Sequence, residues 1–433
     1  MAGPLKEQRV AIVSFDGLSA AQFERLLPQM PLVHSLLEHG NLNELDATPF
    51  SDPQPTWAEI LTGAPWYRNG CGGYGAPQRS LTELKLFSES DLCVEQTLLP
   101  EVDEGQCNIV VNIPLLEANG NRKWMAEASS PTLATVSPAT LLLDEPFKSY
   151  RPRPIISMGK AMADPLAASK FMEAEASRAE CSVALSKESD WKVFMYRASI
   201  FDQLAHLFGP SFLDDGQLKI SAALKLLISK LDAALHKTLS GAGTVLFLSS
   251  FSHTPCQGLF SLNDLFQKLQ LLTISLNDSE EQKLRKQAFA MINSETATPL
   301  VSPCNQILTS HTICASPIRG TVYVNAKDRF VDGIVSKDKI QIYEDRIFAL
   351  LNDELRRVSG SSSLIRNTES NNLAPNFVVN LPGVDLVDSL STTRRNYDLP
   401  HSAHSACGFV WSNAKNSKSL KSVEVSELIT ELA

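Results

Sequence analysis

A short apolar run near the start of the chain, residues 10–15, leads directly into Asp16-Gly17. A run of this length is typical of a buried strand, and ligands of α/β sheets bind at the carboxyl ends of strands. Further strand-like and helix-like segments alternate, the strands at 108–113, 191–196 and 244–248 and the helices at 31–40, 163–185 and 218–239. The alternation predicts an α/β fold with a mostly parallel central sheet flanked by helices, and it puts Asp16 at the ligand-binding edge.

The pattern changes in two places. Residues 120–165 are rich in Pro, Ser and Thr, and we expect them to be irregular. From residue 256 onwards the expected elements are strands at 320–325 and 377–380, a helix at 338–358 and Ser- and Asn-rich joints. A strand at 408–411 then resumes the earlier pattern. We therefore expect a core made of residues 1–255 and 401–433, with residues 256–400 inserted as an α+β cap region.

The length and net charge of the chain limit the kinds of partner that it can bind. A chain of 433 residues with 43% hydrophobic and 20% charged residues is ordinary for a soluble globular protein with a large core. The formal net charge of −9, without a Lys/Arg cluster, argues against a nucleic-acid polymer as partner. A small-molecule substrate, phosphorylated or not, remains compatible, because a local metal ion outweighs the global charge. Nothing in the sequence decides the oligomeric state.

The start of the chain and its cysteines bear on location. The first residues are charged, without the apolar segment of a signal peptide, and no run of about eighteen apolar residues predicts a membrane span. The eight cysteines are scattered without a Cys-x-x-Cys pair. Free thiols in a reducing cytosol fit this pattern better than a disulfide framework, so we expect a cytoplasmic protein with no membrane partner.

Asp202, His206 and His404 are the strongest candidates for metal ligands. Asp202 and His206 are four residues apart, so on a helix they face the same way. Two imidazoles and one carboxylate suit a single divalent ion, zinc in the first place, with manganese and iron as alternatives. The competing interpretation is a set of hydrogen-bonded core residues.

Several segments stand in the order of a known family. They are Asp16-Gly17, the helices at 31–40 and 57–63, the strand at 111–114, Asp202-x-x-x-His206, residues 260–265, 322–325, 332–333 and 374–376, and His404 with Gly408. In this order the chain resembles the alkaline phosphatase superfamily. The closest resemblance is to its type I phosphodiesterase/nucleotide pyrophosphatase branch with the phosphohydrolase/phosphomutase-like relatives. The resemblance spans nearly the whole chain and implies an alkaline phosphatase-like fold.

The resemblance implies two adjacent metal sites, of which one is preserved. Asp202, His206 and His404 match all the ligands of one ion. At the other site Asp16 remains, but the position of the family's nucleophile falls on Pro53. The family's Ser-Asp-His-Gly motif falls on residues 249–252, where both ligands are missing. The resemblance therefore implies a degenerate second site and no covalent phosphoenzyme.

Further residues are candidates around this site. Asp16 could cap the end of its strand, orient a metal-bound water or hold a partial second ion. Thr56 is a candidate substitute nucleophile, although threonine at a helix start is commonly a cap. The candidates for supporting the ligands or binding substrate are Asn69, Ser250, His253 and His401. His253 is expected to be a loop residue rather than a ligand, and His401 a surface residue.

Three functions fit these observations. The first, which we favour, is a diverged metal-dependent hydrolase whose one ion activates water against a phosphoester or a related ester. The second is a repurposed mononuclear enzyme such as a non-haem iron enzyme, because two histidines and a carboxylate form that ligand set too. The third is a catalytically inactive protein that binds a ligand. Ser250-Phe251 in place of an Asp-His pair also makes half of the site less polar, which predicts weak phosphomonoesterase activity.

Overall fold

The structure is a computed structural model. It describes residues 9–37, 40–47, 50, 52–93, 99, 102, 105–117, 122–125, 136–150, 161, 164, 166–188, 190–213, 221–274, 307–359, 363–369, 373–387, 402–413 and 420–432.

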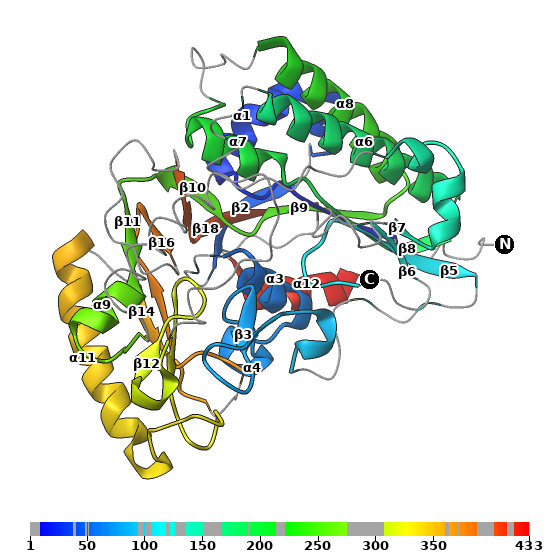
Figure 1. Cartoon of the computed structure of the whole chain (residues 1–433). Coiled ribbons are helices and arrows are strands. Elements are labelled where there is room, and N and C mark those ends of the chain that lie inside the picture. The colour runs from blue at the N-terminus through cyan, green and yellow to red at the C-terminus, as the bar shows by residue number, and fades with distance from the viewer. Residues whose placement is uncertain are drawn as a thin grey trace.

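A nine-stranded sheet with the order β19-β2-β18-β9-β1-β8-β5-β6-β7 forms the centre of the protein (Figure 1). Its strands are β1 (Val10–Ser14), β2 (Asn41–Asp46), β5 (Gln106–Val111), β6 (Arg122–Met125), β7 (Val136–Ser137), β8 (Asp190–Arg197), β9 (Thr244–Ser249), β18 (Cys407–Ser412) and β19 (Leu420–Lys421). β1 lies between β8 and β9 and is parallel to both, and β5 is parallel to β8 and β6. β18 is antiparallel to β2 and β9. The prediction of a mostly parallel central sheet in an α/β fold is confirmed.

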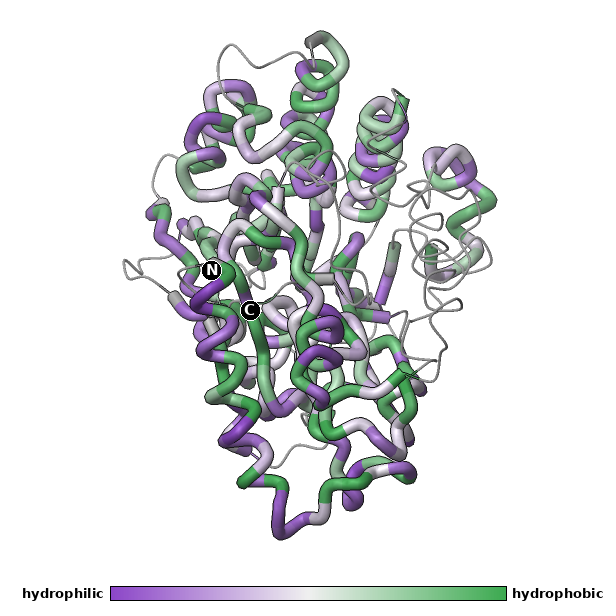
Figure 2. The backbone as a smooth tube through the Cα atoms, turned by 60° about the vertical axis from the view of Figure 1, so that its left-hand side comes forward, coloured by the Kyte–Doolittle hydropathy of each residue, from purple (hydrophilic) through white to green (hydrophobic). Residues whose placement is uncertain are grey.

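Helices cover both faces of this sheet because successive side chains of a strand point to opposite sides. Ala11 and Val13 of β1 belong to one core, whereas Val10 and Ile12 belong to another. The first core is covered by α1 (Ala20–Leu26), α2 (Pro31–Leu36), α6 (Ala167–Glu188), α7 (Ile200–Phe208) and α8 (Ser221–Leu239), and the second by α3 (Gln54–Thr62) and α12 (Ser422–Leu432). Figure 1 shows the two groups on opposite sides, and Figure 2 shows hydrophobic and hydrophilic residues alternating along the helices.

A further hydrophobic core lies mainly within residues 262–386 and surrounds a four-stranded sheet of order β12-β13-β15-β14. Its elements are β12 (Cys314–Ala315), β13 (Thr321–Val324), β14 (Ser363–Arg366), β15 (Phe377–Asn380), α9 (Leu262–Lys268) and α11 (Ile340–Ser359). All pairs in this sheet are antiparallel. In Figure 1 these elements lie together, apart from α6 and α8. The division of the chain into core and cap at residues 256 and 400 stays a prediction.

Two short ladders lie where the chain leaves and re-enters the central sheet. β10 (Ser252–Pro255) pairs antiparallel with β17 (Ser402–Ser405), and His253 is directly opposite His404. β11 (Gly258–Ser261) pairs parallel with β16 (Val384–Val387). The first ladder follows β9 and precedes β18, so it fixes both histidines at one edge of the sheet.

The packing of Phe15, the last apolar residue before Asp16, generates a stability prediction. Its ring centroid lies 5.3 Å from that of Phe201 and 5.7 Å from that of Phe247, and the side chain is fully buried. Phe15→Ala should lower the free energy of unfolding by about 3–5 kcal/mol, measured by urea denaturation. The control Phe208→Ala removes a ring that is 44% exposed and should change it by less than about 0.5 kcal/mol. Equal losses in the two variants would contradict this account of the core.

Candidate metal centre

Helix α7 carries two of the predicted ligands. Asp202 lies in its first turn and His206 in its last, and Oδ1 of Asp202 is 3.4 Å from Nε2 of His206. Gly17 packs against the start of this helix with a φ of +95°, and a Cβ atom at Gly17 would lie 2.7 Å from Cα of Asp202. Only glycine tolerates both the conformation and the contact, so Gly17 lets the end of β1 approach Asp202 closely.

The β10–β17 ladder brings two histidines to the same place. Residues directly opposite each other in an antiparallel ladder present their side chains on one face. Nε2 of His253 lies 3.0 Å from Oδ1 of Asp202, and Nε2 of His404 lies 3.2 Å from the same oxygen. Nε2 of His404 is also 3.1 Å from Nε2 of His206. Imidazole nitrogens of all three histidines therefore surround one carboxylate oxygen.

The spacing of these donor atoms fits a small divalent ion. Ligand bonds of about 2.0–2.1 Å in a tetrahedral zinc site place neighbouring ligand atoms about 3.3 Å apart. The four contacts are 3.0, 3.1, 3.2 and 3.4 Å long, and all four donor atoms lie within 4.8 Å of one another. Without an ion, the three shorter contacts are hydrogen bonds whose directions depend on the imidazole tautomers, and the 3.4 Å contact is electrostatic.

Neighbouring side chains fix the orientation of the imidazoles. Nδ1 of His253 lies 2.8 Å from Oγ of Ser402, so a protonated Nδ1 leaves Nε2 free to bind a metal. The ring of Phe251 lies against His404 with 4.5 Å between centroids and borders His253 at 5.7 Å. Phe251 is buried, so it shields this side of the cluster from water.

The protonation states of the cluster also suit metal binding. Burial lowers the pKa of His206 well below its ordinary value, and burial also lowers the pKa of His253. Burial by itself would raise the pKa of Asp202, but hydrogen bonds from His253 and His404 hold it well below its usual range. Neutral imidazoles and an ionised carboxylate are the forms that bind metal ions.

Asp16 is fully buried and has a different set of partners. Its Oδ1 accepts hydrogen bonds from Oγ of Ser14 at 2.6 Å and from the backbone N and Oγ of Ser250 at 3.0 and 2.8 Å. Its Oδ2 accepts from Nε1 of Trp57 at 2.8 Å and from the guanidinium of Arg197, with which it forms an ion pair. Burial alone would raise the pKa of Asp16, but the Arg197 charge and these hydrogen bonds lower it, so the carboxylate is ionised.

The sequence left three roles open for Asp16: a strand cap, an orienting group for a metal-bound water and a ligand of a partial second ion. These roles stay predictions. In the structure Arg197 neutralises the charge of Asp16, and Ser250 donates a hydrogen bond to it. A catalytic role for Asp16 stays a prediction.

The structure also describes Thr56 and Asn69. Thr56 is buried in the first turn of α3, whose N-cap position is Pro53 with no side-chain cap, so Thr56 is not the cap of this helix. Its role as a substitute nucleophile stays a prediction. The Asn69 side chain donates to the carbonyl of Ala64 and accepts from the backbone N of Cys71, both at 2.8 Å, so it holds its own turn together. His401 lies outside the described residues.

Sequence reasoning underrated His253 and missed Arg197 and Arg319. The expectation that His253 is a loop residue is wrong, because the ladder with β17 makes it a strand residue opposite His404. Arg197 had a signal: it ends an apolar strand, and a charge that is buried there needs a counter-ion. Nη2 of Arg319 lies 2.7 Å from Oδ1 of Asp52, and its charge is among the causes that lower the pKa of His206. No sequence signal linked Arg319 to this region.

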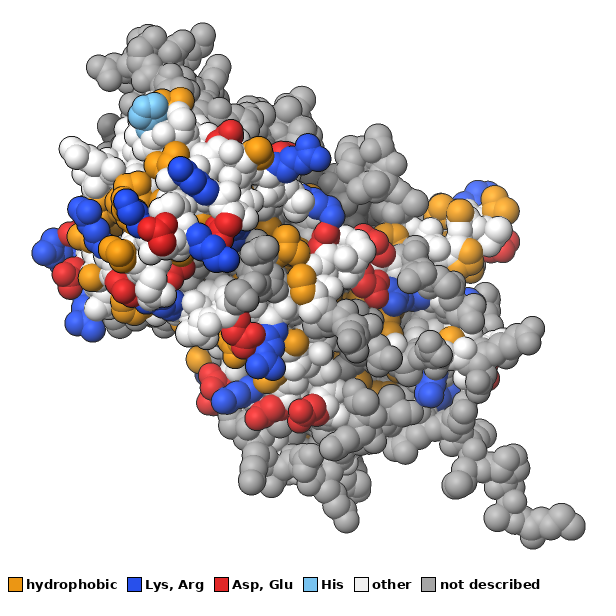
Figure 3. All heavy atoms as spheres, turned by 90° about the horizontal axis from the view of Figure 1, so that it is seen from below, with side chains coloured by type: hydrophobic (Ala, Val, Ile, Leu, Met, Phe, Trp, Pro, Cys, Tyr) orange, Lys and Arg blue, Asp and Glu red, His pale blue; other side chains and the backbone are white. Residues whose placement is uncertain are grey.

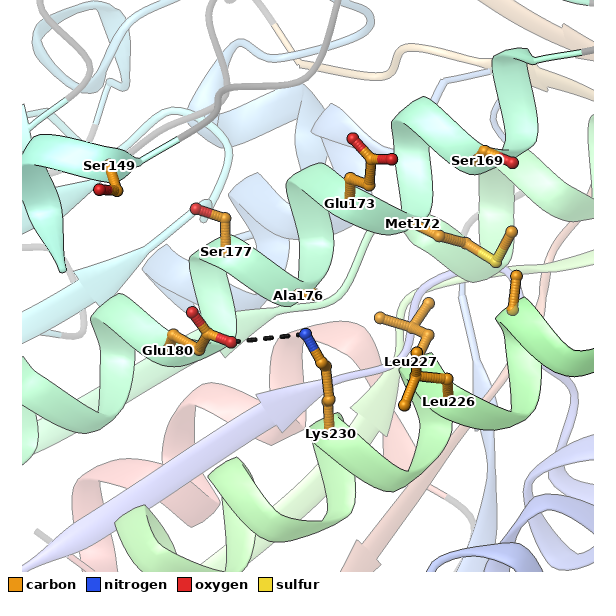
Figure 4. Close-up of a pocket in the computed structure, with 11 residues that line it drawn as sticks. Ser149, Ser169, Met172, Glu173, Ala176, Ser177, Glu180, Leu226, Leu227 and Lys230 are labelled. Atoms are coloured by element: carbon orange, nitrogen blue, oxygen red, sulfur yellow. Dashed lines mark ion pairs between the residues drawn. The ribbon is translucent and has the colours of Figure 1, made fainter.

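A hollow of about 400 Å³ lies elsewhere, between α6 and α8 (Figure 4). It is lined by apolar side chains such as Met172 and Leu227, and Lys230 and Glu180 form an exposed ion pair at its side. On the face shown in Figure 3, acidic and basic side chains are interspersed rather than gathered by sign. In the described part of the chain, no helix is long and apolar enough to cross a membrane.

Comparison with solved structures finds the same fold in two enzymes. Phosphonoacetate hydrolase from Sinorhizobium meliloti 1021, in complex with phosphonoformate, matches with a TM-score of 0.58 and 14% identity over 98% of this chain and 96% of the other. An inactive form of murine ectonucleotide pyrophosphatase/phosphodiesterase 5, in complex with AMP, matches with a TM-score of 0.50 and 12% identity over 98% and 95%.

Both enzymes belong to the alkaline phosphatase superfamily. No protein-family model matches the sequence, and no curated protein sequence matches it. The fold is thus an α/β fold like that of these two enzymes, as the sequence predicted.

The cluster generates a prediction of metal content. The chain should bind one divalent ion per molecule, and His404→Ala and His253→Ala should each lower zinc occupancy at least tenfold after desalting, because each removes a nitrogen donor. Elemental analysis of the purified protein measures this. The control His311→Ala, which removes an exposed histidine, should keep one ion. Unchanged stoichiometry in His404→Ala would show that the ion is bound elsewhere.

Proposed function

We propose that the protein is a diverged metal-dependent hydrolase that holds a single divalent ion, zinc in the first place, and acts on a phosphoester or related ester. The observation that carries this proposal is the convergence of Asp202, His206, His253 and His404 beside a carboxylate, Asp16, that Arg197 already neutralises. A divalent ion supplies Lewis-acid chemistry, which polarises an ester oxygen and activates water. The neutral imidazoles would hold it, and Ser402 would keep His253 oriented.

The charges around the cluster favour a substrate with one negative charge. Arg197 is paired with Asp16, and Arg319 is paired with Asp52 and, at 3.8 Å, with Asp385, so both guanidinium charges are already compensated by protein carboxylates. A divalent ion with Asp202 leaves a single positive charge at the centre. A phosphodiester, a phosphonate monoester or another monoanionic ester matches this charge, whereas the dianion of a phosphomonoester calls for two adjacent cations.

Apolar side chains support an uncharged portion of the substrate. Phe251 borders His404, and Trp57 reaches Asp16 from α3, which begins at Pro53. Pro53 and Phe251 stand where the resemblance implies polar groups of a second metal site. The proposed substrate is therefore a small molecule that carries a monoanionic ester next to an apolar group.

His253 favours a second candidate function. Four protein donors complete a tetrahedral shell, as in structural zinc sites, and such a shell leaves no position for water or substrate. A ligand-binding protein without turnover follows from that arrangement. The side chains of Asp202 and His206 are 19% and 17% exposed, which argues against a coordination shell that is closed to water. The third imidazole also departs from the ligand set of two histidines and one carboxylate, which makes the non-haem iron alternative less favoured.

The proposal includes a cytoplasmic location. The cysteines that the structure describes, Cys71, Cys93, Cys107, Cys181, Cys256, Cys314 and Cys407, are free thiols, which supports a reducing compartment. Burial raises the pKa of Cys71 and of Cys314, so these two thiols behave as inert core groups rather than as nucleophiles.

The charge balance predicts a substrate preference. With added zinc, manganese or magnesium, hydrolysis of a chromogenic phosphodiester should exceed that of the matching monoester at least tenfold, because one cation is available. His404→Ala should abolish both reactions. Monoester turnover on the order of ten per second would contradict the single-ion proposal. If the native protein turns over neither ester but His253→Ala does, the four-donor shell is closed and the second candidate function is correct.

The absence of a family nucleophile predicts the stereochemical course. Pro53 has no nucleophilic group, so water should attack phosphorus directly and invert its configuration. A substrate with a chiral phosphorus centre, analysed by phosphorus NMR after a single turnover, measures this. Thr56→Val should leave the outcome unchanged. Retention that is lost in Thr56→Val would reveal Thr56 as the nucleophile of a covalent intermediate.

A further inference from the structure

The environment of Asp16 carries an inference about the lost half of the site. We propose that Arg197 is a built-in cation that takes the place of a second metal ion and limits the protein to one ion. This inference extends the proposed function. It depends on the proposed function in one respect, the expectation that the native protein binds one ion. Arg197 acts here as a positioning residue, through its hold on Asp16.

The first support is that the carboxylate of Asp16 is saturated. Its acceptor capacity, about four lone-pair sites, is taken up by Ser14, Ser250, Trp57 and Arg197. Asp16 is fully buried, so none of these partners gives way to water. A metal ion could bind Asp16 only after displacing donors from one of its oxygens, either the Arg197 guanidinium and the Trp57 indole from Oδ2 or Ser14 and Ser250 from Oδ1.

The second support is the place of Arg197 in the sheet. It is the last residue of β8 and lies opposite Ser14 of β1. Ser14 precedes Asp16 by two residues. Its side chain is 10% exposed, and its carbonyl accepts a hydrogen bond of 3.1 Å from the amide of Asn112. Because Gly17 touches Asp202, this ion pair lies next to the histidine cluster. The positive charge is therefore built into the strand edge where the resemblance implies a metal.

The third support is the chemistry of the two kinds of cation. A guanidinium keeps its charge at all physiological pH values and cannot dissociate, whereas an ion depends on its supply. An ion pair without water needs hydrogen bonds to its remaining lone pairs, and Ser14, Ser250 and Trp57 provide them. The charge at this half of the site thus stays the same whether or not metal is available. Only the half of the site around Asp202 changes its charge when a metal ion binds.

A pair of rebuilt variants tests the inference through ion counts rather than activity. The double variant Ser250→Asp/Phe251→His restores the carboxylate and imidazole that the resemblance implies. The triple variant adds Arg197→Ala, which frees Asp16 for coordination. After loading with zinc alone, native mass spectrometry should find the same count in the double variant as in the native protein. It should find one more ion in the triple variant, because three protein ligands are then available.

The difference between the two rebuilt variants decides the matter. An extra ion in the double variant, with Arg197 present, would overturn the inference, and so would a folded triple variant without an extra ion. Thermal unfolding checks that each variant is folded, and Arg197→Gln replaces Arg197→Ala if the cavity prevents folding. The matched control adds Arg122→Ala to the double variant instead. Arg122 is equally exposed at 10% and is paired with Glu89, and its removal should add no ion.

The same counts separate this inference from the proposed function. If the native protein binds no zinc, the single-ion centre fails, but a gain of one ion from the double to the triple variant still supports the role of Arg197. If the native protein binds one ion and the triple variant gains none, the single-ion centre stands and the role of Arg197 is overturned.

Discussion

The buried ion pair between Asp16 and Arg197 is the interaction on which this site depends. A carboxylate without contact to water is unstable unless a cation and hydrogen-bond donors surround it. Here the donors come from separate parts of the fold: Ser14 from β1, Arg197 from β8, Ser250 from the position directly after β9, and Trp57 from α3. The hydrogen bonds and the ion pair of this one carboxylate therefore hold three neighbouring strands and a helix in place relative to one another.

The histidine cluster lies next to this ion pair, at the same edge of the central sheet. Gly17 follows Asp16 directly and lets the turn after β1 lie against Asp202 at the start of α7. The β10–β17 ladder then places His253 and His404 over the same carboxylate oxygen. Two carboxylates thus lie near each other in different surroundings. Asp16 is paired with a protein cation, whereas Asp202 is surrounded by three imidazoles.

Much of the fold could be predicted from the sequence because the strands are buried on both faces and read as apolar runs. The predicted bounds of β1, β8 and α11 lie within two residues of those in the structure. The predicted end of α8 at residue 239 is also correct. The short strands β6 and β7 fall in the segment expected to be irregular. Both are short, β7 is the edge strand of the sheet and β6 is its neighbour, and the surrounding Pro- and Ser-rich sequence hides the pattern.

The sequence by itself determined which residues could act as ligands: Asp202 and His206 share a helical face by their spacing, and Pro53 cannot be a nucleophile. Only the tertiary structure decided that His253 joins them and that Arg197 neutralises Asp16. Both contacts join residues more than a hundred positions apart, His253 with His404 and Asp16 with Arg197. Local periodicity carries no information about such pairs, because strand register and sheet order, not spacing along the chain, bring them together.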